Sequence, residues 1–489
     1  MIRSVPATAG PGRIAGFDRL AARRRPLDRL EAAMVRLYLA KPDENARRVL
    51  DRLRYVVSFA RLTAVQNPDG ADIDLLGLLG PHAVSVTGRL EPQVAAAKSL
   101  WDVARLLPEL TADTRRARAS LLAHAIVDRS ALEAEVTTRL LAIASGGGGG
   151  AGYVFPGAYE VVERAGLVPD LMVGTSIGSL MSMFRARRRQ YDPAPMVAAG
   201  RSLAWTNVFR VLETEHRYGL PATLRLYLRA AIGSLFRTPG GRPLRISDME
   251  IPLYIVTTGI TVDGLAHGLE TYEHLLDAEV RVGGPRGVVQ GAFKLVNILR
   301  EFWSRPDALV EMVLGRTAGT EDFDVLDGAG FSASIPGLIH YDVLRDDPHM
   351  KALLDDLYAR WGITRLAEGG MVSNVPARIA WETAIAGTFG RRNVFVLALD
   401  CLAPTWRQPL FLALALAVRA ANGTADRAFA DLYVPMTQSL SPTNLVPAIG
   451  DFLTAIRWGR EQTSPHVPFL VEMMRPIPVL PDAAPDAAR

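Results

Sequence analysis

The sequence of 489 residues contains very little cysteine and very little lysine. The single cysteine, Cys401, excludes an intramolecular disulfide and a cysteine-based zinc site, which is typical of a reducing compartment. Because only four lysines are present, arginine supplies most of the 55 basic side chains, which stand against 51 acidic ones for a net charge of +4. This near balance argues against a nucleic-acid-binding protein, so no nucleic-acid partner is predicted.

Long hydrophobic runs are also missing. The amino terminus lacks the apolar core of a secretory signal, and no stretch of about 18 apolar residues is free of charge. The most apolar segment, Pro409–Val418, is short and lies between Arg407 and Arg419, which favours a buried helix. We therefore expect a cytoplasmic protein. The basic cluster Arg23–Arg25 predicts, in addition, peripheral contact with an anionic membrane surface.

The first part of the chain is predicted to be helical. Residues 1–25 hold many arginines and are expected to be a basic flexible arm, whereas residues 26–138 are expected to form an all-helical accessory region. Apolar residues recur at helical spacing in four segments: Leu27–Leu39, Ala46–Thr63, Val94–Leu107 and Arg115–Thr138. Loop-forming residues at 41–42, 67–70 and 80–81 predict the breaks. Residues 476–489, rich in Pro, Ala and Asp, predict a disordered tail.

From residue 139 to about 475 the pattern changes to that of an α/β domain. Short apolar runs predict strands at Leu140–Ala144, Leu171–Val173, Pro252–Thr258 and Asn393–Asp400. The order strand, glycine loop, helix, strand, tight turn, helix is typical of a mostly parallel sheet with crossover helices. Mostly helical insertions are expected between residues 201 and 249 and between 288 and 313.

A tight turn between the second strand and its helix has the form G-x-S-x-G, in Gly174-Thr175-Ser176-Ile177-Gly178. A serine at such a turn adopts a strained backbone, and the small flanking residues relieve crowding where the chain reverses. Its hydroxyl is then presented beside the amino-terminal N–H groups of the helix. The context therefore predicts that Ser176 is a nucleophile.

Upstream, the glycine loop Gly147–Gly152 opens the first helix of the α/β domain. Its backbone N–H groups can converge on an anion. Three interpretations are open at this point: a nucleotide loop, which lacks the last glycine of G-x-G-x-x-G and the G-K-[ST] of a P-loop; a flexible hinge; or an oxyanion hole. The oxyanion hole needs a nucleophile nearby, and Ser176 follows within one crossover.

Acidic and histidine residues supply the candidate bases. Glu368 precedes two glycines, in Glu368-Gly369-Gly370, and Asn374 and Pro376 follow, so a tight turn is expected to hold an acid at its rim. Asp327 is a second candidate acid. Asp400 followed by His466 has the chain order of a Ser–Asp–His triad. No histidine spacing is typical of metal ligands, so neither a catalytic metal nor any cofactor is predicted.

In this order and spacing the motifs resemble those of the patatin-like phospholipases. Gly147–Gly152 resembles G-G-G-x-x-G, Gly174–Gly178 is G-x-S-x-G, and Glu368–Pro376 resembles D-G-G-x-x-x-N-x-P. Ser332–Pro336 is similar to the A-S-x-A-x-P stretch of that family. The resemblance covers about residues 139 to 401, so residues 139–475 are interpreted as a patatin-like acyl hydrolase domain.

The resemblance implies a three-layer α/β fold and a Ser–acid dyad that hydrolyses acyl esters of lipids. Ser176 would be the nucleophile and Glu368 the acid. The oxyanion hole would use the N–H groups of Gly147, Gly148, Gly149 and Gly150. Motif support would come from Gly152, Gly174, Gly178, Gly369, Gly370 and Asn374. Two residues depart from the family pattern: Ala151 stands where a basic residue is usual, and Glu368 replaces Asp.

The expected function is therefore that of a serine acyl-ester hydrolase acting on a lipid or phospholipid substrate. Two alternatives are open. A patatin-shaped protein with a weakened dyad would bind lipid or act as a scaffold without much turnover. An α/β-hydrolase would use His466 and Asp400 as the base and its orienting acid.

Overall fold

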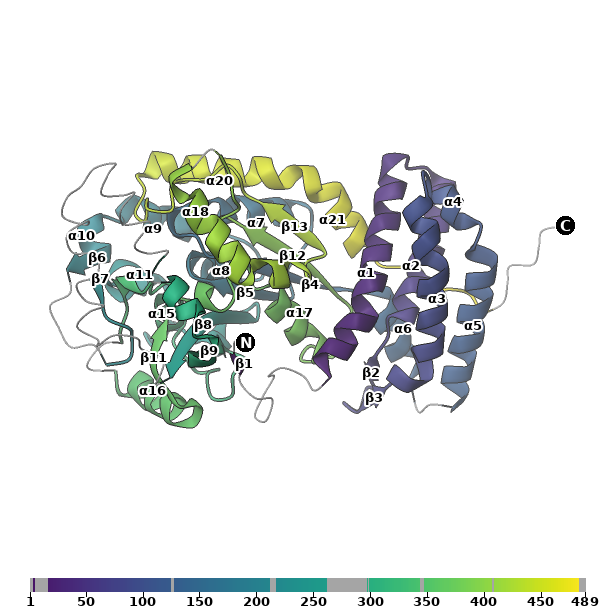
Figure 1. Ribbon diagram of the computed structural model, residues 1–489, viewed down its shortest axis with the longest axis horizontal. Coiled ribbons are helices and arrows are strands. Elements are labelled where there is room, and N and C mark those ends of the chain that lie inside the picture. Colours follow the sequence, from purple (N-terminus) through teal and green to yellow (C-terminus); the bar gives the residue numbers. More distant parts are fainter. Residues whose placement is uncertain are drawn as a thin grey trace. The chain divides into compact units, whose positions relative to one another are not determined.

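The structure is a computed structural model, and it describes residues 3–4, 16–124, 127–211, 217–261, 297, 299–343, 347–406 and 409–482. The chain divides into two units, each assembled from separate segments (Figure 1). The α/β unit comprises Met1–Arg13, Ala142–Ala380 and Val396–Pro465. The helical unit comprises Ile14–Leu141, Trp381–Phe395 and His466–Arg489.

An eight-stranded, mostly parallel sheet forms the centre of the α/β unit. Its strand order is β1-β9-β8-β5-β4-β12-β13, with β11 paired to β8 beyond the end of β5. The strands are β1 (Arg3–Ser4), β4 (Leu140–Ser145), β5 (Leu171–Thr175), β8 (Leu253–Thr261), β9 (Leu309–Leu314), β11 (Ile363–Ala367), β12 (Val394–Asp400) and β13 (Leu432–Pro435). β4 and β12 are buried along their whole length, which is why they read as continuous apolar runs.

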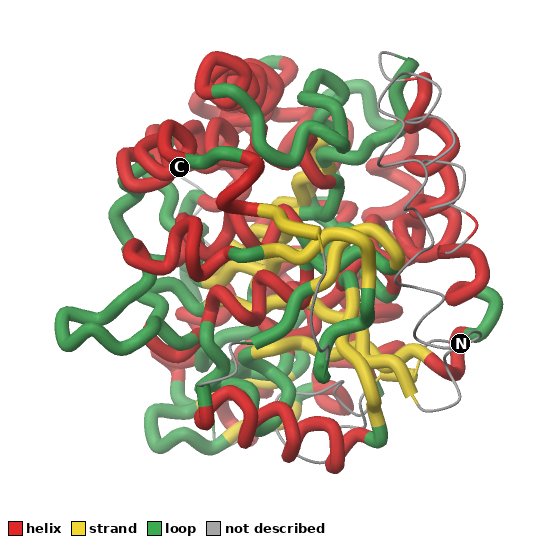
Figure 2. Tube along the Cα trace, turned by 90° about the vertical axis from the view of Figure 1, so that its left-hand side faces the viewer, coloured by secondary structure: helices red, strands yellow, loops and turns green. Residues whose placement is uncertain are grey.

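Helices cover both faces of this sheet, and Figure 2 shows the strands grouped between them. The α/β fold with a mostly parallel central sheet is confirmed. The helices are η1 (Gly149–Val154), α7 (Phe155–Arg164), α8 (Ile177–Ala186), α9 (Ala194–Ser202), α10 (Trp205–Val208), α11 (Leu228–Ile232), η2 (Gly233–Leu235), η3 (Ile246–Asp248), η5 (Pro306–Ala308), α15 (Val325–Ser332), α16 (Pro348–Trp361), η6 (Gly369–Met371), α17 (Ala377–Ile385), α18 (Pro409–Val418), η7 (Arg419–Gly423), α19 (Thr424–Arg427) and α20 (Ile449–Thr463).

A second, three-stranded sheet was not predicted. It has the order β10-β7-β6, from β10 (Gly337–His340), β7 (Ala222–Leu226) and β6 (Phe209–Val211). The expectation of a mostly helical insertion between residues 201 and 249 is therefore wrong, because β6 and β7 pair through an antiparallel ladder there. Of the second insertion, residues 288–296 and 298 lie outside the described residues, and β9 occupies its last part.

The helical unit contains, in its first segment, α1 (Phe17–Ala40), α2 (Glu44–Ala60), α3 (Leu76–Ala96), α4 (Leu100–Ala104), α5 (Leu107–His124) and α6 (Arg129–Thr137), with a small hairpin of β2 (Ala64–Gln66) and β3 (Asp72–Asp74). The predicted all-helical region is thus confirmed, with this hairpin in addition. η8 (Ser464–His466) leads into α21 (Val467–Met474), which completes the unit. Its core includes Tyr55, Phe59 and Leu132, together with Ile477 and Leu480 from the end of the chain.

Helix boundaries differ from the prediction where tertiary contacts outweigh local signals. α1 begins at Phe17 rather than Pro26, because Phe17 is buried and packs edge-to-face on Trp381, with ring centroids 5.3 Å apart. Residues 17–25 are therefore helical, not a flexible arm. Likewise, the buried Ile477 and Leu480 show that the predicted tail over residues 476–489 begins too early. Residues 483–489 lie outside the described residues.

The predicted break at Gly80–Pro81 is wrong, because α3 runs through it. Pro81 cannot donate to the carbonyl of Gly77, but both residues are exposed, so water can satisfy that carbonyl. The buried face of the helix, which includes Leu79 and Val86, holds it in place. Conversely, the predicted helix over residues 94–107 is interrupted, because Ser99 and Asp102 form a capping box that starts α4.

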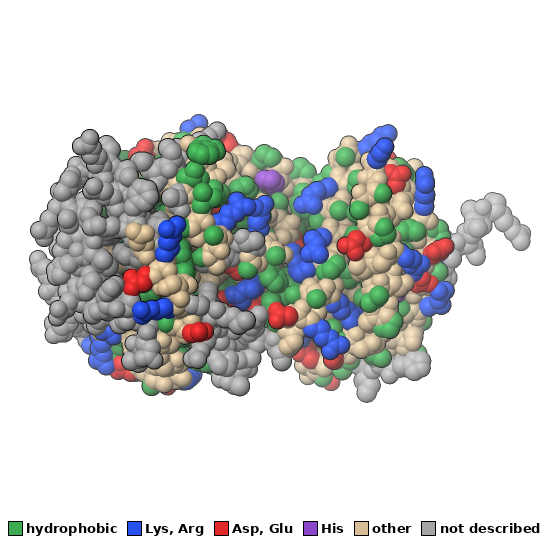
Figure 3. Space-filling model, viewed as in Figure 1, with side chains coloured by type: hydrophobic (Ala, Val, Ile, Leu, Met, Phe, Trp, Pro, Cys, Tyr) green, Lys and Arg blue, Asp and Glu red, His purple; other side chains and the backbone are tan. Residues whose placement is uncertain are grey.

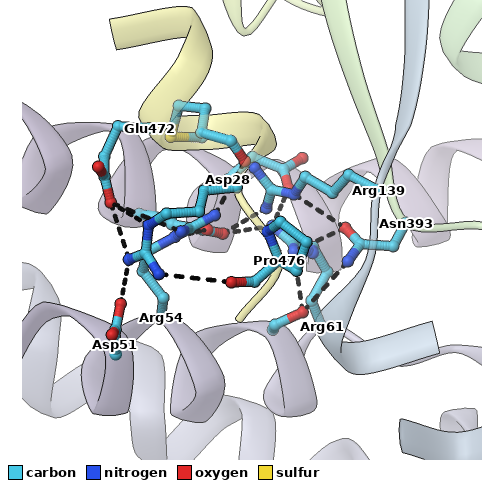
Figure 4. Close-up of polar contacts among 12 residues, drawn as sticks. Asp28, Asp51, Arg54, Arg61, Arg139, Asn393, Glu472 and Pro476 are labelled. Carbon is cyan, nitrogen blue, oxygen red and sulfur yellow. Dashed lines mark hydrogen bonds and ion pairs between the residues drawn. The ribbon is translucent and has the colours of Figure 1, made fainter. Parts of the chain in front are cut away.

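A buried network of charges joins the segments of the helical unit (Figure 4). Arg61 donates to Asp28 at 2.8 Å, to Glu31 at 3.0 Å and to Asn393 at 2.8 Å. Arg54 binds Glu31 at 3.0 Å and the carbonyl of Met473 at 2.8 Å. Burial alone would raise the pKa of Glu31, but three guanidinium groups lower it to about 2, so the carboxylate stays ionised.

Candidate active site

Ser176 lies at the sharp turn between β5 and α8. Among the described residues it is the one non-glycine residue with positive φ, at φ 55° and ψ −127°. The two flanking glycines are required by close approach of the backbone: a Cβ at Gly178 would lie 2.1 Å from the carbonyl oxygen of Ser145, and one at Gly174 would lie 2.5 Å from Cα of Ser179. The G-x-S-x-G spacing therefore follows from the geometry of a strained turn that presents a serine.

The strained turn is held by a buried serine from α15. The backbone N–H of Ser176 donates to Oγ of Ser332 at 2.8 Å, and the Ser332 hydroxyl donates to the carbonyl of Val256 at 2.6 Å. Ser179 Oγ donates to the carbonyl of Ser176 at 2.6 Å. These contacts fix the Ser176 backbone from both sides. Sequence reasoning noted Ser332 as part of the Ser332–Pro336 stretch but missed its role as the hydrogen-bond partner of Ser176.

Glu368 follows β11 directly, and its backbone is pinned on both sides. Its N–H donates to the carbonyl of Ser334 at 2.9 Å, and its carbonyl accepts from Thr258 Oγ1 at 2.7 Å. Gly369 is required next to it, because a Cβ there would lie 2.1 Å from the carbonyl oxygen of Val256. The turn therefore holds the carboxyl at a fixed place beyond the end of β11.

The Glu368 carboxyl is buried and weakly solvated. Its Oε1 accepts from the N–H of Gly370 at 3.4 Å, whereas Oε2 is buried with no hydrogen-bond partner among the described residues. Burial raises the pKa of Glu368 to about 8, and the nearby Ser176 hydroxyl and the Gly370 N–H offset part of this effect. At neutral pH most of the carboxyl is therefore protonated.

Gly147 lies where Ser176, Glu368 and Asn374 converge. A Cβ at Gly147 would stand 2.8 Å from Oδ1 of Asn374, 3.1 Å from Cβ of Ser176 and 3.5 Å from Oε1 of Glu368. The backbone N–H of Gly147 donates to the carbonyl of Asn374 at 3.0 Å. The structure thus brings together the three sequence motifs that supply these residues, and only a residue without a side chain fits at their centre.

The glycine loop differs in detail from the predicted set of four donors. The N–H of Gly147 is used by Asn374, and the N–H of Gly150 donates to the carbonyl of Pro442 at 2.9 Å. Among the described residues, no protein acceptor takes the N–H groups of Gly148 and Gly149. Two of the four predicted donors are therefore not taken up by a protein acceptor among the described residues.

A segment near the end of the α/β unit packs against this loop. Cβ atoms at Gly149 and Gly150 would lie 2.3 Å from the carbonyl oxygens of Pro442 and Asn444, respectively. Tyr153 donates to the carbonyl of Leu445 at 2.6 Å. Sequence reasoning placed residues 441–445 outside the motifs, and no local signal in them points to the site. Gly152 is also closely packed, since its Cβ would lie 2.4 Å from the Ile177 side chain.

Ser176 opens into an almost entirely apolar cavity of about 100 Å³. α8 contributes Ile177, Leu180, Met181 and Phe184 to its wall. Other lining residues come from elements that include α9, α11, β6, β7, β10 and α20 and from the 445–447 segment; among them are Met196, Ala199, Phe209, Leu226, Leu228, Ile232 and Phe452. The cavity suits a hydrocarbon chain bound beside a serine hydroxyl.

The other candidate bases are engaged elsewhere. Asp327 is buried in contact with Arg229, at 3.0 Å from its Nε, and accepts from the Tyr341 hydroxyl at 2.5 Å. Asp400 accepts from the Tyr433 hydroxyl and from the N–H of Leu402. His466 belongs to the helical unit, and the described residues lining the cavity beside Ser176 include no histidine.

Arg185 and the predicted membrane contacts Arg23–Arg25 have internal partners. Arg185 is buried and donates to the carbonyls of Arg188 and Arg189 and to Glu163. Within the helical unit, Arg23 donates to the carbonyl of Leu76 at 2.7 Å, Arg24 to the carbonyl of Arg392 at 2.7 Å, and Arg25 to Asp28 at 2.9 Å. The predicted membrane contact through Arg23–Arg25 therefore has no support in the structure.

In the described part of the chain, no cluster of three or more His, Cys, Asp or Glu side chains is arranged to hold a metal ion. No helix of that part combines the length and the apolar character needed to cross a bilayer.

Comparison with known proteins identifies the α/β unit. The patatin-like phospholipase family matches residues 143–381, which contain Ser176, Glu368 and the glycine loop. The chain therefore carries a patatin-like phospholipase domain, and at the level of the family it is related to lipid hydrolases.

Three curated relatives share part of this region. The chain is similar to patatin-like phospholipase domain-containing protein 6 of Mus musculus, Pongo abelii and Homo sapiens, with 30% identity over 139 residues in each case. The matched stretch covers 28% of this chain and 10% of each relative, so the chain spans about a tenth of their length.

Proposed function

We propose that this protein hydrolyses acyl esters of lipids through a Ser176–Glu368 dyad. The observation that carries the proposal is the position of Ser176, which lies at a strained turn, close to a buried carboxyl and at the opening of an apolar cavity. Each of these three features alone has a structural explanation, but together they meet the geometric needs of acyl transfer.

In the first half of the reaction, ionised Glu368 takes the proton of the Ser176 hydroxyl while Oγ attacks the ester carbonyl. The negative charge that develops on the carbonyl oxygen is held by the N–H groups of Gly148 and Gly149, whose removal would cost about 3–4 kcal/mol per donor. Glu368 then returns its proton to the departing alcohol, which leaves an acyl ester on Ser176.

In the second half, Glu368 takes a proton from water, and the resulting hydroxide attacks the acyl-Ser176 carbonyl. The same two N–H groups hold the second oxyanion, and the proton returns to Ser176 as the fatty acid leaves. The apolar cavity would hold the acyl chain throughout, and this explains why its wall carries almost no polar atoms.

Glutamate in place of aspartate is compatible with this role, because the turn is anchored through Ser334 and Thr258 and positions the longer side chain beside Gly147. The test is turnover of short- and long-chain esters by the purified protein, beside Ser176→Ala and Glu368→Gln. We expect both variants to lose turnover. A parent no faster than Ser176→Ala on either ester overturns the proposal.

A second candidate function is that of a lipid-binding protein with little turnover. It is favoured by the raised pKa of Glu368. At neutral pH most of the carboxyl is then protonated, and the protonated form cannot accept the Ser176 proton. In that case the parent and Ser176→Ala would bind a fluorescent fatty-acid ester equally, and the parent would not turn it over even at pH 9.

A further inference from the structure

α18 has no polar residue, although one of its sides faces solvent. Its buried side carries Phe411, Ala415 and Val418, which are spaced at i, i+4 and i+7. Away from that side, Leu416 is 50% exposed, and Leu412 is half-buried. A helix at the surface of a water-soluble domain normally carries polar residues on its outer side, so an apolar outer side indicates a contact surface.

Trp406, three residues before α18 in the sequence, is a second exposed apolar side chain. It is 84% exposed, more than any other large hydrophobic side chain in the described part of the chain. Tryptophan side chains of this kind are enriched where a protein meets the boundary between lipid and water. Figure 3 shows hydrophobic side chains gathered on this face of the α/β unit in the region of α18, with basic side chains beside them.

The exposed charged residues in the segment that follows α18, residues 419–430, are positive. Arg419 and Arg427 follow α18 and are exposed. The one carboxylate between residues 401 and 430, Asp426, is buried and accepts from Ser373 Oγ at 2.5 Å, so its charge is used internally. An apolar helix followed by exposed basic residues is complementary to a bilayer whose headgroups are anionic.

This surface is connected directly to the candidate active site. β12 ends at Asp400, and Cys401 lies against the glycine loop, with its Sγ 3.4 Å from the carbonyl oxygen of Gly147. Trp406 and α18 follow within a few residues on the same unit. A helix of ten residues is too short to cross a bilayer, but its length suits a position in the plane of the interface.

We propose that α18 and Trp406 form the docking surface by which this protein binds an anionic lipid bilayer. The inference rests on the proposed function, since a lipid hydrolase must take its substrate from such a surface. The membrane contact expected from Arg23–Arg25 is thereby reassigned, because those arginines bind internal partners.

The experiment measures co-flotation of the full chain with phosphatidylcholine vesicles, prepared with and without phosphatidylglycerol. The Ser176→Ala protein is used, so that binding is measured without hydrolysis. We expect Trp406→Glu and Leu416→Glu to weaken binding about tenfold or more, since each places a charge on the exposed apolar surface that would enter the bilayer. Val84→Glu is the matched control, because Val84 is 73% exposed on α3 of the helical unit.

Two further readouts separate docking from folding and from catalysis. With Ser176 intact, turnover of a water-soluble short-chain ester is expected to be unchanged in Trp406→Glu and Leu416→Glu. Brominated lipids are expected to quench part of the tryptophan fluorescence of the parent protein, and Trp406→Phe is expected to lose that part.

The proposal is overturned if the parent does not float with anionic vesicles, if both α18 variants float as it does, or if Val84→Glu weakens binding equally. Dissociation of a parent oligomer by Leu416→Glu would instead assign this surface to a second copy of the chain. Vesicle binding without ester turnover would overturn the proposed function while leaving the docking surface in place.

Discussion

The backbone N–H of Ser176 and the hydroxyl of Ser332 form a hydrogen bond of 2.8 Å, which ties the strained turn to α15. Ser332→Ala leaves that buried N–H without an acceptor, at a cost of about 1–3 kcal/mol in the free energy of unfolding. We expect a roughly tenfold loss of kcat as well, because the Ser176 backbone is no longer fixed. Ester kinetics and urea unfolding measure the two effects.

Ser334→Ala is the matched control for Ser332→Ala. Its hydroxyl is equally buried and donates to the carbonyl of Phe331 at 2.6 Å, but it does not contact Ser176. It should lower stability and leave kcat nearly unchanged. Equal kcat losses in the two variants would contradict the positioning role of Ser332.

Ester turnover should rise with pH through about 8, because Glu368 must be ionised to act as a base and its pKa is raised to about 8 by burial. The measurement is kcat/KM for a soluble ester between pH 6 and about 9.5, which reports the pKa of the free enzyme. A profile that is flat over this range would exclude Glu368 as the base.

The same ionisation should affect stability. Since the folded pKa of Glu368 lies above its unfolded value of 4.5, its contribution to stability is fully present below about pH 4.5 and is lost as pH rises toward 8. Glu368→Gln removes this titration. We therefore expect the variant to gain stability relative to the parent between pH 5 and about 8 in urea unfolding, and a constant difference would argue against a buried, titrating carboxyl.

Gly178→Ala should abolish the turn at Ser176, because the added Cβ would lie 2.1 Å from a backbone oxygen that cannot move aside easily. We expect loss of turnover and a destabilisation of several kcal/mol, on the order of an overpacked core site. Gly88→Ala is the comparison, since nothing lies within 4 Å of its Cβ position on α3. That variant should gain about 0.5–1 kcal/mol in thermal or urea unfolding.

Breaking the buried charge network of the helical unit should be costly. Arg61→Met leaves the carboxylates of Asp28 and Glu31 underpaired at sites that are nearly inaccessible to water, so about 3–5 kcal/mol of stability should be lost. Arg48→Met is the control, because its pair with Glu44 is exposed and should contribute less than about 1 kcal/mol. Similar unfolding midpoints for the two variants would contradict the network's role.

Filling the apolar cavity should shorten the preferred acyl chain. Ala199 lines the cavity, so Ala199→Phe should lower kcat/KM for long-chain esters about tenfold or more while acetyl esters are turned over as before. The comparison of two chain lengths in one variant controls for folding. Parallel losses on both esters would place the acyl chain elsewhere.

The fold and the main elements of the candidate site could be predicted because their signals are local. Five glycines before a helix and a serine between glycines each indicate a backbone that approaches another backbone too closely for a side chain. The structure shows such contacts at Gly178 and Gly150. The Glu368 turn is local in the same sense, since Gly369 must lie against β8.

Other parts depend on contacts between residues distant in sequence. The amides of Gly147 and Gly150 donate to Asn374 and Pro442, so which loop amides have a protein acceptor depends on residues more than 200 positions away in the sequence. The β6–β7 ladder and the continuation of α1 before Pro26 likewise depend on tertiary pairing and on Trp381. Periodicity in a single sequence carries no information about such partners.

The helical unit is assembled from segments that lie far apart in the sequence, so these segments are synthesised at different times. Its first segment ends at Leu141, yet Ile477 and Leu480, from the last described residues, lie in the same core, and Met473 accepts a hydrogen bond from Arg54. At about 5–20 residues per second, the ribosome reaches these residues on the order of tens of seconds after the first segment is complete. The core of the helical unit therefore cannot close until Leu480 has been synthesised, long after its first segment is complete.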